Sequence, residues 1–245
     1  QELHLVNERF NEEEEPTCFA DSFIGEMRKR EGKGEELGSF SHQQLRAACC
    51  DLWLNGFETT AITLRYAFIY LINHPRVQLK TQHEIDEKIG KRPVAMDDQK
   101  ALHYCNAVIQ EVLRMEPGSI GFSRQVSAPV NIAGYDIPIG TGVIPQLSLV
   151  NMDPKEYERP DYFCSERHLN DKGEFNKDPR LTPFSMGKRS CLGEGLARME
   201  LFIFFTTFLQ QLTFASVTKI PPELKLTTSL AQAPVPYEVI MKGRE

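Results

Sequence analysis

The sequence predicts a mainly α-helical protein with small β-sheets, an α+β fold. Residues 43–73 contain no proline and are dominated by apolar side chains, which is typical of one long, largely buried helix. Further helical stretches are expected at 75–90, 98–115 and 193–211. Between them, short apolar runs separated by Pro and Gly at 121–147 indicate short strands and turns.

The helix boundaries follow from capping residues. Ser41 and Gln44 form a capping box before the long helix. Pro75 ends that helix at the preceding residue and suits the first position of the next, which Gly90 closes. Pro117 ends the third of these helices.

The rest of the chain is expected to be shorter elements and loops. A short helix is predicted at 20–29, a long loop at 151–190 and a C-terminal β-hairpin at 224–241. The short β runs are expected at 121–126, 130–132, 135–139 and 143–147.

Composition narrows the class of protein. The 245 residues, 41% of them hydrophobic, suffice for one core, so a single domain over 1–245 is expected. A net charge of -6 argues against a nucleic-acid partner, and the acidic run Glu12–Glu15 is expected to be a solvated face. Six cysteines without a C-x-x-C pair suit a reducing intracellular compartment rather than a zinc or disulfide framework. No apolar run reaches the roughly 18 residues that span a bilayer.

One cysteine lies in a segment suited to ligating an iron. Cys191 directly precedes a predicted helix, whose N-terminal N–H groups favour a thiolate. Gly187 and Gly193 let the backbone approach a flat ring closely, and Phe184 can limit water. Arg189 can pair with a carboxylate of the bound group. For an isolated cysteine, the alternative is a structural thiol at a helix start.

The whole string F-x-x-G-x-R-x-C-x-G, from Phe184 to Gly193, resembles the haem-binding signature of the cytochrome P450 family. The resemblance implies haem b as the cofactor, Cys191 as the axial iron ligand, and haem contacts from Phe184, Gly187, Arg189 and Gly193. It also implies the C-terminal half of the P450 fold, with a long central helix and a cysteine loop before the last helix. The similarity covers nearly the whole chain and is nearest to the microsomal, animal drug- and steroid-oxidising type.

A helical E-x-x-R pair forms the second landmark. Glu111 and Arg114 are three residues apart, so they share one helix face and can form an ion pair. Alone, such a pair is more often surface decoration. It resembles the E-x-x-R motif of the family, which implies a structural triad with Arg167 that locks the cysteine loop. His168 stands where the family more often has an aromatic residue.

The long helix carries the third landmark, Asn55 to Thr60, which resembles the oxygen-activation segment of the family. The resemblance implies a helix distorted at Gly56 and a proton relay through Glu58 and Thr59. Asn55 departs from the usual Ala or Gly and is expected to narrow the pocket or to bind a ligand. An ordinary surface turn of helix is the alternative.

Arg124 is expected on a strand, where the family often has a basic residue near a haem propionate; an exposed strand arginine is equally consistent. The segment 119–123 resembles a substrate-contacting segment.

Together these landmarks imply a haem-thiolate monooxygenase. It would insert one oxygen atom from O₂ into an apolar small molecule, with electrons from an NADPH-dependent flavoprotein reductase. The N-terminal half and its membrane anchor are expected to be missing, so membrane association at the endoplasmic reticulum would belong to a full-length relative. The alternatives are a truncated, inactive remnant and a helical scaffold without a cofactor.

Overall fold

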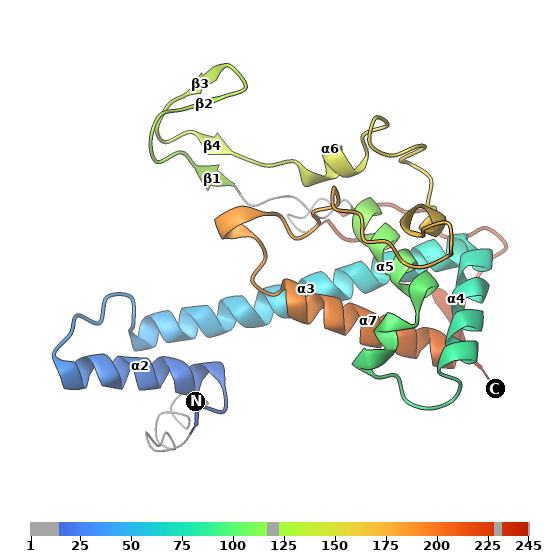
Figure 1. The fold of residues 1–245 in the computed structure, drawn as a ribbon, viewed down its shortest axis with the longest axis horizontal. Helices are drawn as coiled ribbons and strands as arrows, with labels where there is room; N and C mark the ends of the chain where they lie inside the picture. The colour runs from blue at the N-terminus through green and yellow to red at the C-terminus, as the bar shows by residue number, and fades with distance from the viewer. Residues whose placement is uncertain (1–14, 117–122, 228–231, 245) are drawn as a thin grey trace. The chain divides into compact units, whose positions relative to one another are not determined.

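The computed structural model describes residues 15–116, 123–227 and 232–244 (Figure 1). It is mainly helical with small antiparallel sheets, which confirms the predicted α+β class. The residues separate into two compact units, 1–58 and 59–245.

The first unit contains α2 (Phe19–Lys33) and the beginning of α3 (His42–Asn73). The helix α2 is longer than the predicted 20–29 and ends at Gly34, whose φ of 68° is left-handed. One hydrogen bond of the predicted capping box is present: the backbone N–H of Gln44 donates to the Ser41 hydroxyl oxygen at 3.1 Å. Ile24 and Leu45 are buried in a small apolar cluster of this unit.

The second unit continues with α4 (Pro75–Lys88), whose start agrees with the prediction. Gly90 adopts a φ of 66° directly after it, as expected of a glycine that closes a helix.

The helix predicted at 98–115 is wrong in one respect, because it divides into a short 3-10 helix η1 (Met96–Lys100) and α5 (His103–Met115). A carboxylate from α4 explains where α5 begins. Glu84 accepts the backbone N–H of Tyr104 and of Cys105, each at 2.8 Å. These are N–H groups of the first turn, which have no partner within a helix.

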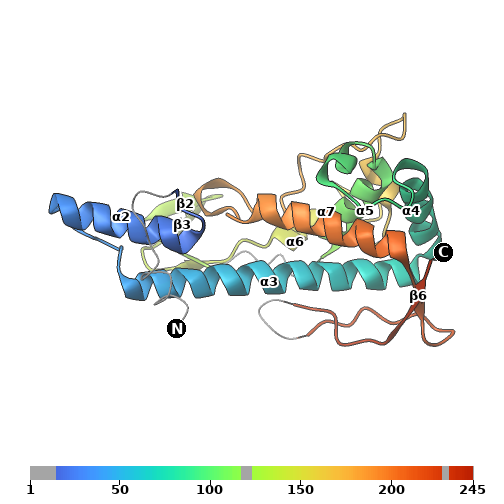
Figure 2. The same ribbon diagram turned by 90° about the horizontal axis from the view of Figure 1, so that it is seen from below.

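The core of the second unit is built around α7 (Glu194–Gln211), close to the predicted 193–211. In both ribbon views α7 lies beside the later part of α3, with α4 and α5 near its C-terminal part (Figures 1 and 2). The ring of Phe68 lies 5.4 Å from that of Phe208 and 4.4 Å from that of Phe214. The fully or almost fully buried apolar side chains of this core include Tyr66, Leu71, Ile85, Leu102, Val108, Phe202, Phe205 and Leu209.

The described residues form three two-stranded antiparallel sheets in addition to the helices. The strand β2 (Val130–Ile132) pairs with β3 (Tyr135–Ile137), and β1 (Arg124–Gln125) pairs with β4 (Gly142–Val143). The strand predicted at 143–147 is wrong over most of its length, since only Val143 lies in β4 and Leu147 begins the short helix α6 (Leu147–Asn151).

The predicted hairpin at 224–241 is also wrong in its pairing. The strand β6 (Val239–Gly243) pairs with β5 (Leu212–Ser216), which directly follows α7 and was not predicted. The described residues of 224–238 contain one isolated bridge, between Leu226 and Pro234. The sequence missed β5 because its apolar residues continue those of the helix before it.

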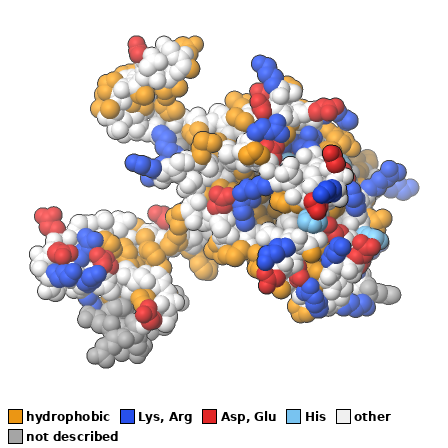
Figure 3. Space-filling view, in the orientation of Figure 1, with side chains coloured by type: hydrophobic (Ala, Val, Ile, Leu, Met, Phe, Trp, Pro, Cys, Tyr) orange, Lys and Arg blue, Asp and Glu red, His pale blue; other side chains and the backbone are white. Residues whose placement is uncertain are grey.

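The long loop predicted at 151–190 begins at the last residue of α6 and contains two short 3-10 turns, η2 (Ser165–His168) and η3 (Gly187–Arg189), and an isolated bridge between Leu169 and Phe175. Among the residues the structure describes, no helix combines the length and apolarity needed to cross a bilayer. Apolar side chains nevertheless remain visible on the outside (Figure 3), and several are exposed by more than half, including Trp53, Phe57, Leu149, Met186, Leu192 and Leu196.

Candidate active site

Residues 184–193 form a tight loop that presents Cys191 directly before α7. The Cys191 amide donates to the Phe184 carbonyl oxygen at 2.8 Å, and the Ser190 amide donates to the Gly187 carbonyl oxygen at 3.0 Å. Gly187 has a φ of 76°, a conformation in which a side chain would be strained. Backbone hydrogen bonds and one glycine therefore set the shape of this loop.

The Cys191 side chain is exposed, and so are its apolar neighbours. Met186 is 70% exposed and Leu192 is 87% exposed, so the thiol lies among uncovered apolar side chains. A Cβ atom added at Gly193 would lie 3.9 Å from the Cys191 sulfur, at ordinary contact distance. The sulfur is thus reachable by a ligand, with an apolar surface beside it.

These residues fit the haem that the cysteine string implies. An accessible sulfur is a donor for iron, and the exposed Met186 and Leu192 offer apolar surface to a flat, largely apolar ring. Arg189 is exposed on the same loop and supplies a cation for a carboxylate. Cys191 would hold the iron, and Phe184, Gly187 and Gly193 would shape the loop around it.

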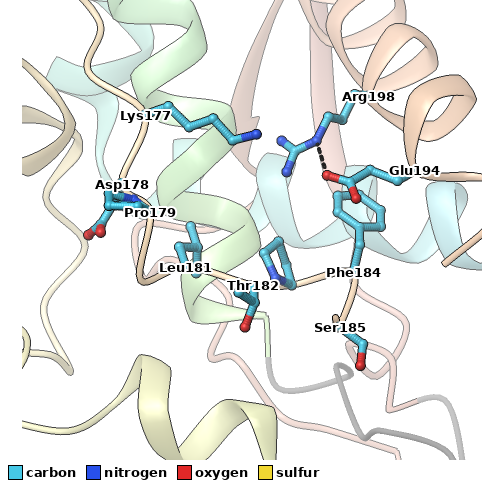
Figure 4. Close-up of a pocket in the computed structure, with 10 residues that line it drawn as sticks. Lys177, Asp178, Pro179, Leu181, Thr182, Phe184, Ser185, Glu194 and Arg198 are labelled. Atoms are coloured by element: carbon cyan, nitrogen blue, oxygen red, sulfur yellow. Dashed lines mark hydrogen bonds and ion pairs between the residues drawn. The ribbon is translucent and has the colours of Figure 1, made fainter. Parts of the chain in front are cut away.

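A cavity of about 400 Å³ lies on one side of this loop (Figure 4). Phe184, Glu194 and Arg198 line it, together with residues of the segment 177–183. Arg198 Nε donates to Glu194 at 2.8 Å, and its guanidinium carbon lies 4.8 Å from the centre of the Phe184 ring. The side chain of Phe184 is therefore packed under an arginine that is itself ion-paired.

The second predicted group, around Glu111, is buried. Arg114 donates to the Glu111 carboxylate through Nε at 2.8 Å and through a terminal nitrogen at 2.9 Å. Arg167 Nε donates to it at 3.0 Å. The Cys164 backbone amide adds a fourth donor at 3.0 Å. The structure thus brings together the three residues that the sequence predicted as a triad.

The two arginines also hold the long loop by its backbone. Arg114 donates to the carbonyl oxygens of Asn151 at 2.7 Å and Pro160 at 2.8 Å. Arg167 donates to those of Glu158 and Tyr162, both at 3.1 Å. The segment 151–162 is therefore tied to α5 through charged side chains rather than through secondary structure.

His168 completes this cluster, and its role was missed from the sequence. Its Nε2 lies 2.8 Å from the Glu111 carboxylate, and its Nδ1 lies 3.0 Å from the Gln110 amide nitrogen. Since that amide nitrogen donates to Nδ1, the hydrogen of the imidazole is on Nε2 and is donated to Glu111. The sequence feature that could have revealed this role is that His168 stands where the family more often has an aromatic residue.

Burial and charge act in opposite directions on Glu111. Burial alone would raise the pKa of this carboxyl, but hydrogen bonds from Arg114 and His168 and the charge of Arg114 lower its pKa below the ordinary value. The carboxylate is consequently ionised at neutral pH, as an ion pair with a buried arginine requires.

The predicted oxygen-activation residues lie on α3, where Glu58 and Thr59 are both exposed. The expected distortion at Gly56 is wrong in this structure, because α3 is helical without interruption through that residue. The Asn55 amide donates to the Asp51 carbonyl oxygen at 2.7 Å, one turn earlier. Glu58 is the last residue of the first compact unit and Thr59 is the first of the second.

Arg124 is half-buried on β1, opposite Val143 in β4. Its strand position agrees with the prediction. Of the predicted substrate-contacting segment, residues 119–122 lie outside the described residues.

Comparison with known proteins identifies the family. A model of the family "Cytochrome P450" matches residues 2–241. The chain belongs to the cytochrome P450 family.

Individual relatives are similar over most of the chain. A probable cytochrome P450, CYP36A1 of Caenorhabditis elegans, is 41% identical over 94% of this chain and 47% of its own length. Cytochrome P450 2J5 of Mus musculus is 40% identical over 92% of this chain and 45% of its own length. Cytochrome P450 2J2 of Homo sapiens is 38% identical over 90% and 44%.

The chain thus spans about half the length of the curated relatives that it matches. Family membership excludes the cofactor-free helical scaffold as an explanation of the motifs, and the similarity does not favour the inactive remnant. Members of this family bind haem b through a cysteine thiolate.

Proposed function

We propose that this protein is a haem-thiolate monooxygenase that inserts one atom of O₂ into an apolar small organic molecule. The accessible Cys191 sulfur, held before α7 in the complete P450 cysteine string, carries this proposal. Bound haem would supply oxygen activation, with the second oxygen atom leaving as water after two electrons and two protons are delivered. The substrate would be a xenobiotic, a steroid or a fatty-acid-like molecule.

The chain's own residues have distinct parts in this proposal. Cys191 ligates the iron, while Arg189 and Arg124 bind the haem carboxylates. Glu58 and Thr59 deliver protons from the exposed side of α3. Glu111, with Arg114 and Arg167, fixes the long loop that leads to Cys191. Phe184 limits access of water to the sulfur.

Electrons would come from an NADPH-dependent flavoprotein reductase that docks near the cysteine loop. Lys188 is exposed in that loop, and Arg198 lies in the cavity beside it. Both offer positive charge to an acidic partner surface. By resemblance to the microsomal type, we place the protein at the endoplasmic reticulum membrane.

The first test is the carbon monoxide difference spectrum of the reduced, haem-supplied protein. Thiolate ligation gives a strongly red-shifted Soret band, which we expect for the wild-type protein and not for Cys191→Ser. The matched control is Cys50→Ser, which removes another exposed thiol and should keep the band. Survival of the band in Cys191→Ser would disprove the ligand assignment.

The second test is turnover with a flavoprotein reductase and NADPH. Product that carries one labelled oxygen atom from O₂ supports the proposal. Haem binding without such product, in the presence of a reductase that reduces the iron, would contradict the monooxygenase function.

A further inference from the structure

A second buried carboxyl lies at the end of α5 and faces α3. Glu116 is 9% exposed, and its carboxyl oxygen Oε2 lies 2.8 Å from the hydroxyl of Thr63, which is 7% exposed. The same hydroxyl lies 3.1 Å from the carbonyl oxygen of Thr59, one turn earlier in α3. Thr63 therefore connects Glu116 with the backbone of a residue in the predicted proton relay.

Counting hydrogens favours one state of this group. If Glu116 is ionised, the single hydrogen of the Thr63 hydroxyl has to be shared between two acceptors, the carboxylate and the Thr59 carbonyl oxygen. If Glu116 is protonated, its O–H donates to Thr63 and the Thr63 O–H donates to the Thr59 carbonyl. The protonated acid therefore gives each of the two contacts a hydrogen of its own.

The charges around Glu116 favour the same state. In the described part of the chain, Glu116 is in no ion pair, and its neighbour Arg114 is engaged by Glu111 and by backbone carbonyls. Burial raises the pKa of Glu116 to about 7, against a smaller lowering by the Thr63 hydrogen bond.

The other titratable groups facing it bring no positive charge. From α3, Tyr66 and Tyr70 lie near this carboxyl; burial is the main reason that the pKa of both phenols is raised, and a negative charge on Glu116 would raise it further. Their hydroxyls donate elsewhere, to the carbonyl oxygens of Gln232 and Met115. From α7, Glu200 accepts a hydrogen bond from Thr60 at 3.2 Å, which adds a further acid to this turn of α3.

We propose that Glu116 is a protonated acid that donates to Thr63 and thereby holds the Thr63 hydroxyl on the Thr59 carbonyl. Glu116 is then a positioning residue for the oxygen-activation segment, acting through Thr63 and not on the substrate. A threonine hydroxyl bound to the carbonyl one turn earlier changes the local geometry of a helix. When Glu116 is ionised, the Thr63 hydroxyl donates to the carboxylate instead, and the Thr59 carbonyl oxygen loses its hydrogen bond from Thr63. The last step rests on the proposed function, whereas the protonation state does not.

The protonation state is tested by infrared spectroscopy of the haem-loaded protein at pH 5.5 and pH 8.5. We expect the carbonyl band of a protonated acid in the wild-type protein at the lower pH, its loss at the higher pH, and its absence from Glu116→Gln. The control Glu223→Gln removes an exposed carboxyl and should keep the band. A spectrum of Glu116→Gln that matches the wild type at both pH values would overturn the proposal.

Unfolding in denaturant gives an independent test. A pKa of about 7 in the folded state, above the usual value near 4.5, means that the folded protein binds the proton more tightly. The unfolding constant of the wild type, relative to that of Glu116→Gln, should then rise roughly 70-fold from pH 5 to pH 8. Parallel pH profiles of the two proteins would contradict a protonated Glu116.

Turnover tests the positioning role. The fraction of consumed O₂ that appears in product should fall in the wild type as the pH rises through 7, and should stay level in Glu116→Gln, whose amide always donates. Thr63→Val should show the low fraction at every pH. An equal pH dependence in all three proteins would overturn the positioning role. If no protein turns over while the infrared and unfolding results hold, the proposed function fails and the protonated acid stands.

Discussion

The Glu111 cluster and the cysteine loop are built in opposite ways, although both belong to the second compact unit. The Glu111 carboxylate is fully buried and accepts hydrogen bonds from two guanidinium groups, an imidazole and a backbone amide. The cysteine loop is shaped by backbone hydrogen bonds and leaves its sulfur and its apolar side chains exposed. The chain itself therefore completes the first group, whereas the second is open to a ligand.

Substitutions in the Glu111 cluster should therefore affect folding, whereas substitutions in the cysteine loop should affect binding. Loss of a side chain in the Glu111 cluster leaves charges buried without partners, so it should be felt in the free energy of unfolding. Loss of an exposed side chain in the cysteine loop leaves no such penalty, so it should be felt only when a ligand binds.

The largest effect is expected for Glu111→Ala. It leaves Arg114 buried without its carboxylate, which should lower the free energy of unfolding by about 3–5 kcal/mol. Denaturant unfolding measures the loss. The control is Glu223→Ala, which removes an exposed carboxylate paired with Lys225 and should cost less than about 1 kcal/mol. A folded, haem-replete Glu111→Ala protein of wild-type stability would contradict the structural role.

A smaller effect is expected for His168→Phe, which restores the ring type commoner in the family. The exchange removes one donor from Glu111 and leaves the buried Gln110 amide nitrogen with only its long contact to the Asn176 carbonyl oxygen, at 3.5 Å, which should cost about 1–3 kcal/mol. The double variant with Gln110→Leu should recover part of the loss, because the poorly paired amide is removed as well. Wild-type stability of His168→Phe would show that the imidazole contributes only its shape.

Two buried carboxyls, Glu111 in α5 and Glu116 directly after it, should make the free energy of unfolding depend on pH in opposite directions. The pKa of Glu111 is lowered on folding, so its contribution is present above the unfolded value of about 4.5 and is lost as the pH falls through the folded value. The pKa of Glu116 is raised, so its contribution is full at low pH and is lost as the pH rises toward 7.

Unfolding profiles of Glu111→Gln and Glu116→Gln, each subtracted from the wild-type profile, measure these signs. The Glu111 difference should shrink below pH 4.5, and the Glu116 difference should change between pH 5 and pH 8. If both differences changed in the same direction with rising pH, Glu111 and Glu116 would not differ in electrostatic surroundings as they do in the structure, with cations beside Glu111 and, among the described residues, none paired with Glu116.

The sequence predicted those features that depend on short-range signals. The boundaries of α3 and α4 followed from Ser41 and Pro75, because capping and proline act within one helical turn. Two partners of Glu111, Arg114 and Arg167, followed from a family motif, whereas its contacts with His168 and the Cys164 amide did not. The start of α5 could not be predicted, because it depends on a carboxylate of Glu84 that is near it only after folding.

Longer-range pairings were beyond the sequence for the same reason. The strand β6 was predicted in a local hairpin at 224–241, but it pairs with β5, to which no short turn connects it. Likewise, Glu116 reads as an ordinary helix-end acid, and its burial against Thr63 depends on how α5 meets α3. Both cases involve residues more than 20 positions apart in the chain.

The smallest effect on folding is expected for Cys191→Ser without haem. The Cys191 side chain is exposed and the loop is held by backbone groups, so the free energy of unfolding should change by less than about 0.5 kcal/mol. The same variant should lose the thiolate spectrum entirely when haem is supplied. A loss of stability as large as that of Glu111→Ala would mean that the cysteine loop is part of the folding core, and the separation between the two regions would then fail. Small loss of stability together with complete loss of the spectrum would place Cys191 in binding alone, since the backbone that carries it would be intact.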